Sequence, residues 1–202
     1  MTSSLPIRCF CGQLEGAAHD VAPEAGTHLK CYCDDCQAFQ KLLGHAERVL
    51  DEHGGTEIFQ MSAGKIEITK GNEHLACLRL TPKGPLRWYA SCCNAPLGNT
   101  LATPALPFFG VIGTCFDRSG GGEAVDRALG PLKPGVFGRF ALGDRAAVDA
   151  HDRVPLSAIG GFLGKVIGWR FGGAHKHSPF FEDGRPVATP RVVSEDGAPP
   201  SR

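Results

Sequence analysis

The stretch Cys31-Tyr32-Cys33-Asp34-Asp35-Cys36 places three thiols within six residues, immediately before a predicted helix. Alternate side chains of an extended segment point to the same side, so Cys31 and Cys33 are expected to face one ion. Cys36 lies in the first turn of the predicted helix, where the helix dipole lowers the pKa of a thiol. Thiolates grouped in this way are soft ligands that suit tetrahedral zinc. The stretch therefore predicts a zinc site, and any activity is expected beside it.

The number of ligands at this site indicates its type. Three protein ligands with a free fourth position are typical of catalytic zinc, and no fourth cysteine or histidine is adjacent in the sequence. We therefore expect Cys31, Cys33 and Cys36 to form an open site. The alternative is a closed structural site that a distant residue completes, such as His28, His45 or a cysteine of another cluster.

Two further clusters form a second set, Cys9-Phe10-Cys11, which precedes Gly12, and Cys92-Cys93. We expect them to make a four-thiolate zinc site that links the N-terminal segment to the end of a strand region. Adjacent side chains of a regular strand point in opposite directions, so Cys92 and Cys93 both ligate only if the backbone bends there. Otherwise Cys93 alone ligates and the site is incomplete. The isolated Cys77 and Cys115 are expected to be buried thiols without a metal.

Charge and hydropathy narrow the class of protein. Lys plus Arg and Asp plus Glu number 21 each, and this balance argues against a dedicated nucleic-acid or anionic-membrane binder. No run approaches the roughly 18 apolar residues of a membrane span, and the opening MTSSLPIRCFCG lacks the apolar centre of a secretory signal. We therefore expect a cytoplasmic protein with no nucleic-acid or membrane partner. In that reducing compartment, clustered cysteines bind metal more often than they form disulfides.

Local patterns predict a mainly β chain with antiparallel sheets. A helix is expected next to the cysteines, with Asp34 as N-cap, Gln37 at the third helical position and an end at Gly54-Gly55. Over residues 56–93, short alternating runs separated by turn residues predict an antiparallel meander. The apolar segment 103–116 is expected to be a further strand or a buried hairpin.

A second helix is predicted over residues 154–171, where apolar side chains recur at helical spacing. The stripe favours a helix of the core over a membrane-surface anchor, because few basic residues accompany it. Glycines within the helix are expected to allow close packing. These residues are Leu156, Ile159, Phe162, Leu163, Val166 and Ile167 in the stripe, and Gly160, Gly161, Gly164 and Gly168.

The whole chain is expected to form a single zinc domain over residues 1–185, with a helical C-terminal part at about 119–171. A flexible tail is expected over residues 186–202, which are rich in proline, glycine and charge. His175-Lys176-His177 follows two glycines and is expected to lie in a solvated loop. It is not expected to bind metal.

The three cysteine clusters resemble the pattern of the glutathione-dependent formaldehyde-activating enzymes, a family that also includes centromere protein V. That pattern is CxCG, then CxCxxC, then an aromatic residue followed by CxxCG. The matching stretches here are Cys9-Phe10-Cys11-Gly12, residues 31–36 and Arg87-Trp88-Tyr89-Ala90-Ser91-Cys92-Cys93-Asn94. Order and approximate spacing agree over residues 6–100, and the segment PFF…GRPVATP is similar to the C-terminus of the family.

The resemblance implies a β-tent zinc-binding fold, two zinc ions and an adduct-forming activity. It assigns Cys9, Cys11 and Cys93 to a structural zinc, and Cys31, Cys33 and Cys36 to a zinc at the active site near glutathione. The activity of the family joins glutathione to formaldehyde to give S-hydroxymethylglutathione, and it is classed as a carbon–sulfur lyase. The chain departs from the pattern in its third cluster, so it resembles a divergent branch.

The departures concern the structural site. Ala90 stands where the family has the first cysteine of CxxCG, Asn94 replaces the glycine, and Cys92 is an additional thiol. The site has therefore lost one ligand or has moved it by two residues. Asp35, Gln37 and His45 are near the three cysteines in sequence only, and the sequence identifies no general acid.

Three hypotheses about function follow. The first is a zinc-dependent carbon–sulfur lyase that forms or breaks adducts between a small-molecule thiol, such as glutathione, and an aldehyde. The second is a non-catalytic zinc-binding module that binds glutathione or a protein partner. The third is a redox-active thiol protein, which requires Cys92 and Cys93 to be exposed and free of metal.

Overall fold

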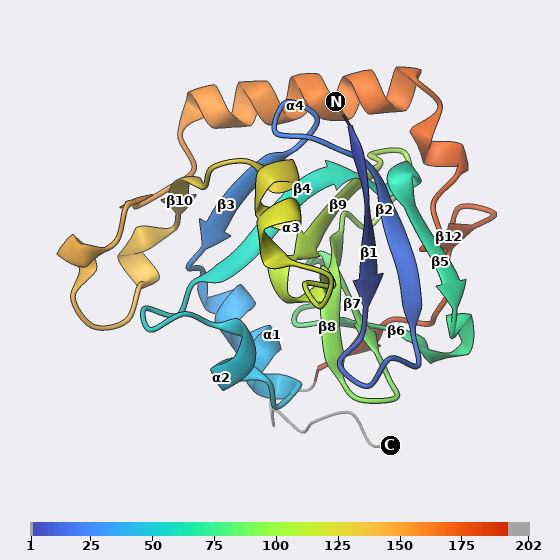
Figure 1. Ribbon diagram of the computed structural model, residues 1–202, viewed down its shortest axis with the longest axis horizontal. Helices are drawn as coiled ribbons and strands as arrows, with labels where there is room; N and C mark the ends of the chain where they lie inside the picture. The colour runs from blue at the N-terminus through green and yellow to red at the C-terminus, as the bar shows by residue number, and fades with distance from the viewer. Residues whose placement is uncertain (1, 194–202) are drawn as a thin grey trace.

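The computed structural model describes residues 2–193 and is mainly β, with two packed sheets and a long C-terminal helix (Figure 1). The larger sheet has the strand order β11-β10-β3-β4-β9-β8-β7-β6-β14, and the smaller has the order β1-β2-β5. The mainly β prediction with an added C-terminal helix is confirmed. The strands of the larger sheet are β3 (Thr27–Cys31), β4 (Thr56–Ser62), β6 (Leu75–Arg79), β7 (Leu86–Ala90), β8 (Ala95–Thr100), β9 (Phe108–Ile112), β10 (Lys133–Val136), β11 (Ala150–His151) and β14 (Arg191–Val192).

The smaller sheet comprises β1 (Ser3–Arg8), β2 (Glu15–Val21) and β5 (Ile66–Lys70), and a short hairpin of β12 (Phe181–Glu182) and β13 (Arg185–Pro186) stands apart. The predicted meander over residues 56–93 is only partly right. β6, β7, β8 and β9 pair in consecutive antiparallel order, but β4 pairs with β9, and β5 leaves to join β2. The 3₁₀ turn Ala63–Lys65 between β4 and β5 redirects the chain from one sheet to the other.

The main core lies between the two sheets. Trp88 and Phe109 project from the larger sheet and are almost fully buried. The ring of Phe180 stacks on Phe109 with centroids 4.3 Å apart and lies 5.0 Å from that of Trp88. Phe180 therefore anchors the segment that follows the long helix, since burial of an aromatic ring contributes several kcal/mol.

Residues 186–193 of the predicted tail contact the larger sheet. β14 pairs in parallel with β6, and the Val193 N–H donates to the Arg79 carbonyl at 2.8 Å. This part of the predicted tail is therefore attached to the domain. The exposed edge of β6 offers backbone hydrogen-bond partners, which composition alone does not predict. The rest of the predicted tail, residues 194–202, lies outside the described residues.

The helix next to the cysteines differs from its prediction. It is divided into α1 (Asp34–Leu42) and α2 (Ala46–Val49), with Gly44 between them at a φ of 77°. The N-cap is Cys33 and not Asp34, because the Cys33 sulfur accepts the backbone N–H of Cys36. The single-helix expectation was wrong because the left-handed backbone at Gly44 interrupts a periodicity that otherwise continues.

The C-terminal part at about 119–171 is mixed rather than wholly helical. It contains α3 (Gly122–Leu129) and α4 (Leu156–Phe171), but β10 and β11 lie between them and extend the larger sheet beyond β3. Short 3₁₀ turns complete the chain at Ala63–Lys65, Asn72–His74, Gly113–Cys115, Gly138–Phe140, Arg145–Ala147 and Ala174–Lys176. No helix in residues 2–193 is long and apolar enough to cross a membrane.

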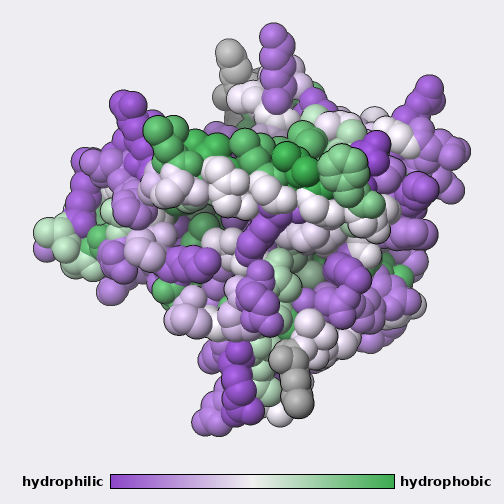
Figure 2. All heavy atoms as spheres, turned by 90° about the horizontal axis from the view of Figure 1, so that it is seen from above, coloured by the Kyte–Doolittle hydropathy of each residue, from purple (hydrophilic) through white to green (hydrophobic). Residues whose placement is uncertain are grey.

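The expectation that α4 belongs to the core was wrong. α4 crosses the top of the molecule in Figure 1, and a row of apolar side chains follows it across the surface in Figure 2. Leu156 is 85% exposed, Leu163 50% and Ile167 53%, whereas Val166 is buried. A Cβ atom at any of the four helix glycines would meet no atom within 4 Å, so they provide no close packing. Helical periodicity identified the stripe, but it does not determine what the stripe meets.

Candidate metal centres and the α4 pocket

Four cysteines from two distant turns form what we call the four-cysteine group: Cys9, Cys11, Cys92 and Cys93. The first pair follows β1, and the second lies in the turn between β7 and β8. Gly12, with a φ of 73°, and Asn94, with a φ of 55°, reverse the chain directly after each pair. The bend that Cys92 and Cys93 require in order to face one ion is therefore present.

The sulfur positions of the four-cysteine group fit a tetrahedral ion. The Sγ atom of Cys11 lies 3.5 Å from those of Cys9 and Cys92, the Cys9–Cys92 distance is 3.7 Å and the Cys92–Cys93 distance is 4.0 Å. A zinc–sulfur bond of about 2.3 Å in tetrahedral geometry requires sulfurs separated by about 3.8 Å. The group could thus hold one metal ion with four thiolates and no open position.

Backbone contacts prepare this group for a thiolate. Burial opposes ionisation of Cys9, but the Leu14 N–H, which donates to its sulfur at 3.3 Å, and contacts with Cys11 together lower its pKa to about 7. His45 is not a ligand here, because its Nε2–H donates to the Cys93 carbonyl at 2.8 Å. This contact attaches the segment between α1 and α2 to the turn that carries Cys93.

The three-cysteine group comprises Cys31 at the end of β3, Cys33 at the N-cap of α1 and Cys36 in its first turn. The Cys31 and Cys33 sulfurs are 3.4 Å apart, and all three sulfurs lie within 4.8 Å of one another. The Cys36 N–H donates to the Cys33 sulfur at 3.4 Å. The group could hold a metal ion with three thiolates. The soft sulfur donors favour a soft metal ion but do not identify the metal.

Contacts within the three-cysteine group favour a thiolate at Cys36. Hydrogen bonds from Cys31 and Cys33 lower the pKa of Cys36 well below its usual value, and the nearby Arg87 guanidinium lowers it further. The same contacts raise the pKa of Cys31. The start of α1 adds the favourable end of a helix dipole. The site is therefore electrostatically suited to retain anionic sulfur.

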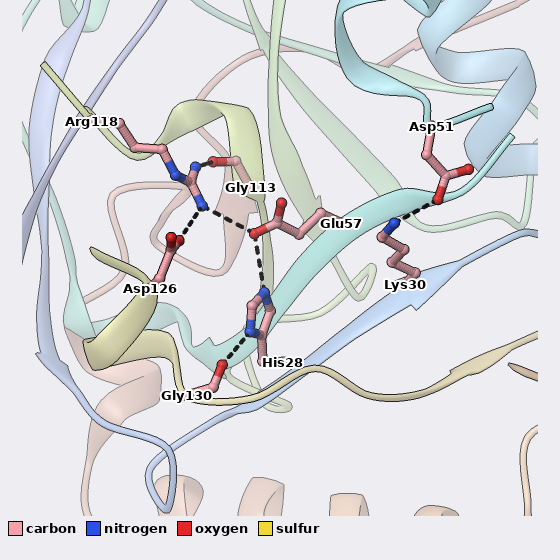
Figure 3. Close-up of polar contacts among 8 residues, drawn as sticks. All are labelled: His28, Lys30, Asp51, Glu57, Gly113, Arg118, Asp126 and Gly130. Carbon is pink, nitrogen blue, oxygen red and sulfur yellow. Dashed lines mark hydrogen bonds and ion pairs between the residues drawn. The ribbon is translucent and has the colours of Figure 1, made fainter. Parts of the chain in front are cut away.

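No further ligand closes the three-cysteine group within residues 2–193, since no histidine, cysteine or carboxylate joins the three sulfurs. His28, one of the predicted alternatives, projects from β3 into a polar network (Figure 3). Its Nδ1–H donates to the Gly130 carbonyl at 2.8 Å, and its Nε2–H donates to Glu57 at 3.0 Å. His45 lies at the other group, so neither histidine completes this one.

The network around His28 is a structural element behind the site. Arg118 donates to Glu57 and to Asp126, at 3.2 Å in each case, and to the Gly113 carbonyl at 2.7 Å (Figure 3). Both ring nitrogens of His28 face acceptors, an arrangement that favours the protonated ring. Burial, the largest single influence, lowers the pKa of His28, but the hydrogen bonds to Glu57 and Gly130 and the charge of Glu57 together raise it. The network ties α3 to β3 and β4.

A pocket of about 960 Å³ lies between the larger sheet and α4, and we call it the α4 pocket. Alternate residues of β3 face it, namely Thr27, Leu29 and Cys31, whereas His28 faces the opposite side. Cys33 and Cys36 also contribute to its wall, but no member of the four-cysteine group does. The remaining wall includes Asp34, Asp35, Ile58, Gln60, Arg87, Asn99, Phe108, Lys133, Val136, His151, Ile159, Phe162 and Lys165.

Arg87 is a site residue that the sequence reasoning missed. It lies on β7, its side chain is 5% exposed, and one of its terminal nitrogens donates to Asp35 at 3.3 Å. Its Nε atom is buried and has no hydrogen-bond partner among residues 2–193. Its guanidinium carbon lies 5.4 Å from the centre of the Phe39 ring. The signal was a single charged residue within the otherwise apolar strand LRWYA, whose residues are all buried.

The other predicted residues have structural positions. Gln37 is buried and its amide donates to the Tyr32 and Phe140 carbonyls at 2.9 and 3.0 Å, so it does not face the metal group. Cys77 and Cys115 are buried, and the Cys115 thiol donates to the Pro96 carbonyl at 2.9 Å. The segment that contains His175 forms a 3₁₀ turn on the surface, where Arg170 contacts the His175 ring.

Comparisons with known proteins give a family but no activity. No protein with curated annotation matches the chain. A crystal structure of a Rhodobacter sphaeroides protein is similar over 56% of this chain and 88% of its own, with 15% sequence identity and a TM-score of 0.40. Residues 1–190 match the family described as "Family of unknown function (DUF6151)". The chain therefore belongs to this family.

Proposed function

We propose that this protein is a zinc-dependent enzyme that forms or breaks a carbon–sulfur bond between a small-molecule thiol and an aldehyde. One observation carries the proposal: the three-cysteine group lies in the wall of the α4 pocket and lacks a fourth protein ligand within residues 2–193. Glutathione and formaldehyde are the first substrates to test, because the cysteine pattern resembles that of the formaldehyde-activating enzymes.

The contrast between the two groups supports this resemblance. The family pattern has a cysteine where this chain has Ala90, which is buried within β7. Cys92 brings a sulfur to the same group from the following turn, 3.5 Å from Cys11. A four-thiolate set is thus retained with one ligand displaced by two residues, as expected of a structural site in a divergent member.

Cys31, Cys33 and Cys36 would hold the metal at the reaction centre. When bound there, zinc supplies a position at which a substrate thiolate is held and kept ionised. Three thiolate ligands already donate strongly to the ion, so we favour this role over activation of water. The helix dipole of α1 and the Arg87 guanidinium offset part of the negative charge of the thiolates.

Arg87 is the residue that we assign to the carbonyl oxygen. Attack of the substrate sulfur on the aldehyde carbon forms the C–S bond and moves the π electron pair to oxygen, which then takes a proton from water to become a hydroxyl. A buried guanidinium with an unpartnered Nε stabilises that developing charge, because donors in a water-poor site act strongly. Asp35 orients Arg87 through their 3.3 Å contact.

The proposal is tested by following the hydroxymethyl thioether signal with NMR in mixtures of glutathione, formaldehyde and zinc-loaded protein. We expect the wild type to exceed the uncatalysed rate and Cys33→Ser to lose this excess. Cys77→Ala is the matched control, because it removes a buried thiol outside both groups. A wild-type rate equal to the uncatalysed rate would exclude this activity.

A second measurement separates the enzyme from the non-catalytic alternative. Glutathione binding by the zinc-loaded wild type, lost in Cys33→Ser and without any rate enhancement, would favour a binding module. Rate enhancement together with such binding supports the enzyme.

A further inference from the structure

The α4 pocket is larger than formaldehyde requires, and its two ends differ chemically. The three-cysteine group and Asp35 lie at one end. At the other, Lys165 of α4 donates to the carbonyl of Gly26, the residue before β3. Cys31 lies five positions after Gly26 along an extended strand, so the two residues are roughly 16 Å apart. The pocket therefore follows the length of β3.

The end away from the cysteines carries positive charge without a counter-charge. Lys133 and Lys165 both line the pocket. The backbone of Lys133 lies beside Leu29 in the middle of β3, and its charge is close enough to contribute to the lowered pKa of Lys165, after the larger effect of burial. Within residues 2–193 neither lysine pairs with a carboxylate. His151 lies nearer the three-cysteine group, because it pairs with Val136, which in turn pairs with Cys31. Two neighbouring cations without an acid are the arrangement expected where an anionic ligand supplies the missing charge.

The wall between the two ends is apolar. Leu29 and Ile58 are neighbours on paired strands between the two ends. Val136, level with Cys31, and Phe108, near the Gly26 end, continue the apolar surface, and Phe108 contacts Phe162 of α4 edge to face with centroids 5.1 Å apart. Such a wall favours a hydrocarbon body over a small polar one, because it gains from contact with apolar surface.

We propose that the α4 pocket binds a long-chain thiol acid, with its carboxylate at Lys133 and Lys165 and its sulfur at the three-cysteine group. The proposal rests on the proposed function for the chemistry at the sulfur end, and it adds the substrate class. The hydrocarbon chain would lie along β3 beneath α4, so that the same helix both contributes Lys165 and covers the ligand.

The test is calorimetric binding of 11-mercaptoundecanoic acid to the full-length zinc-loaded protein, below the micelle concentration. The matched neutral probe is 11-mercapto-1-undecanol, and the matched short probe is 3-mercaptopropionic acid. We expect the long acid to bind about tenfold more tightly than the long alcohol, since one well-made charged contact is worth about that factor. The short acid should bind more weakly still, because it lacks the hydrocarbon body that contacts the apolar wall. Equal affinity of the long acid and the long alcohol would overturn the assignment of the lysine end.

Variants locate the effect. The double variant Lys133→Gln, Lys165→Gln is expected to remove the tenfold preference for the acid and to leave the affinity of the alcohol unchanged. Glutamine at 165 can still donate to Gly26, so α4 is expected to stay in place. Lys176→Gln, an exposed change outside the pocket, is the control. A preference that survives in the double variant contradicts the proposal.

Undecanoic acid, which has no thiol, separates this inference from the proposed function. Its binding depends on the pocket and the two lysines but not on the metal. Lysine-dependent binding of undecanoic acid without any thiol–aldehyde activity would support the pocket assignment and refute the enzyme. Thiol–aldehyde activity without such binding would refute the pocket assignment alone.

Discussion

The two cysteine groups have similar sulfur distances but contrasting surroundings. The four-cysteine group unites cysteines of two turns that are 81 to 84 residues apart in sequence, whereas the three-cysteine group lies within one strand-to-helix connection. The four-cysteine group does not line the α4 pocket, and its four sulfurs could surround one ion. The three-cysteine group lines that pocket with three sulfurs. Under the proposed function, the first group serves the fold and the second serves the reaction.

The largest expected effect is on stability. Cys11→Ser should lower the free energy of unfolding of the metal-loaded protein by about 3–5 kcal/mol, because a cross-link that closes a loop of this length constrains the unfolded chain by about that amount. Cys33→Ser should cost only about 1 kcal/mol, since a local CxCxxC can still bind metal in the unfolded chain and so contributes less. Urea denaturation of both variants measures the difference.

Cys11 is exposed, so its substitution creates no cavity in the core. The control is the same denaturation after metal removal with a chelator, where the two variants should differ little from the wild type. Equal losses for Cys11→Ser and Cys33→Ser in metal-loaded protein would show that the two groups do not divide the roles in this way.

The second prediction concerns the reaction. Arg87→Lys should lower kcat by about a hundredfold with a smaller change in KM, because loss of one donor to a developing oxyanion has effects of that size. The metal content should stay at the wild-type value. Arg79→Lys, a change outside the pocket wall, is the matched control. An unchanged kcat in Arg87→Lys would remove Arg87 from the proposed mechanism.

The third prediction concerns the helix over the pocket. Phe162→Ala removes the edge-to-face contact with Phe108 and should speed hydrogen exchange of the α4 amides about tenfold, which corresponds to about 1.4 kcal/mol. Leu163→Ala, on the exposed side of the helix, is the control and should change exchange much less. Amides near the four-cysteine group should not respond. Faster exchange throughout the protein would contradict a local role for this contact.

The smallest effect is a pH dependence behind the pocket. The raised pKa of His28 means that its contribution is complete below the unfolded pKa of about 6.5 and is lost as pH rises through the folded pKa. The pKa of Glu57 is lowered, above all by the hydrogen bond from His28, so its contribution is present above the unfolded pKa and is lost as pH falls through the folded value. Stability from this pair should thus be greatest between about pH 4.5 and 6.5.

Unfolding of the metal-loaded wild type above pH 6.5 should therefore reveal a loss on the order of 1 kcal/mol that His28→Gln lacks. His19→Gln is the matched control, because His19 contacts Glu67 at 2.9 Å on the surface, where such pairs contribute little. Persistence of the full pH-dependent loss in His28→Gln would assign it to other groups.

The sequence was informative where chemistry is local. The CxCxxC spacing placed Cys31, Cys33 and Cys36 together, and Gly12 after Cys11 marked one of the two turns of the four-cysteine group. The members of the four-cysteine group come from two turns that are far apart in sequence. Only the presence of two thiols in each turn suggested that they share one metal ion. Strand type was also predictable over 75–90, because alternation and turn residues agree there.

The remainder depended on tertiary packing. The stripe of α4 has the period of a core helix, yet α4 covers a pocket and leaves Leu156 and Ile167 exposed. The partner of β5 is chosen by a turn and by β2, which lies 45 or more residues earlier. The burial of Arg87 requires Asp35, the cysteine group and Phe39, which come from another part of the chain. Periodicity reports which side chains share a face and not what that face meets.

The central claim is that the three-cysteine group has an open coordination position and the four-cysteine group has none. The most direct test is the visible spectrum of the cobalt-substituted protein during titration with glutathione. We predict two cobalt ions per chain, a spectral change on addition of the thiol in the wild type, and one cobalt ion with no spectral response in Cys33→Ser. A wild-type spectrum that the thiol leaves unchanged, or a response that persists in Cys33→Ser, would contradict the assignment of Cys31, Cys33 and Cys36 as the open site.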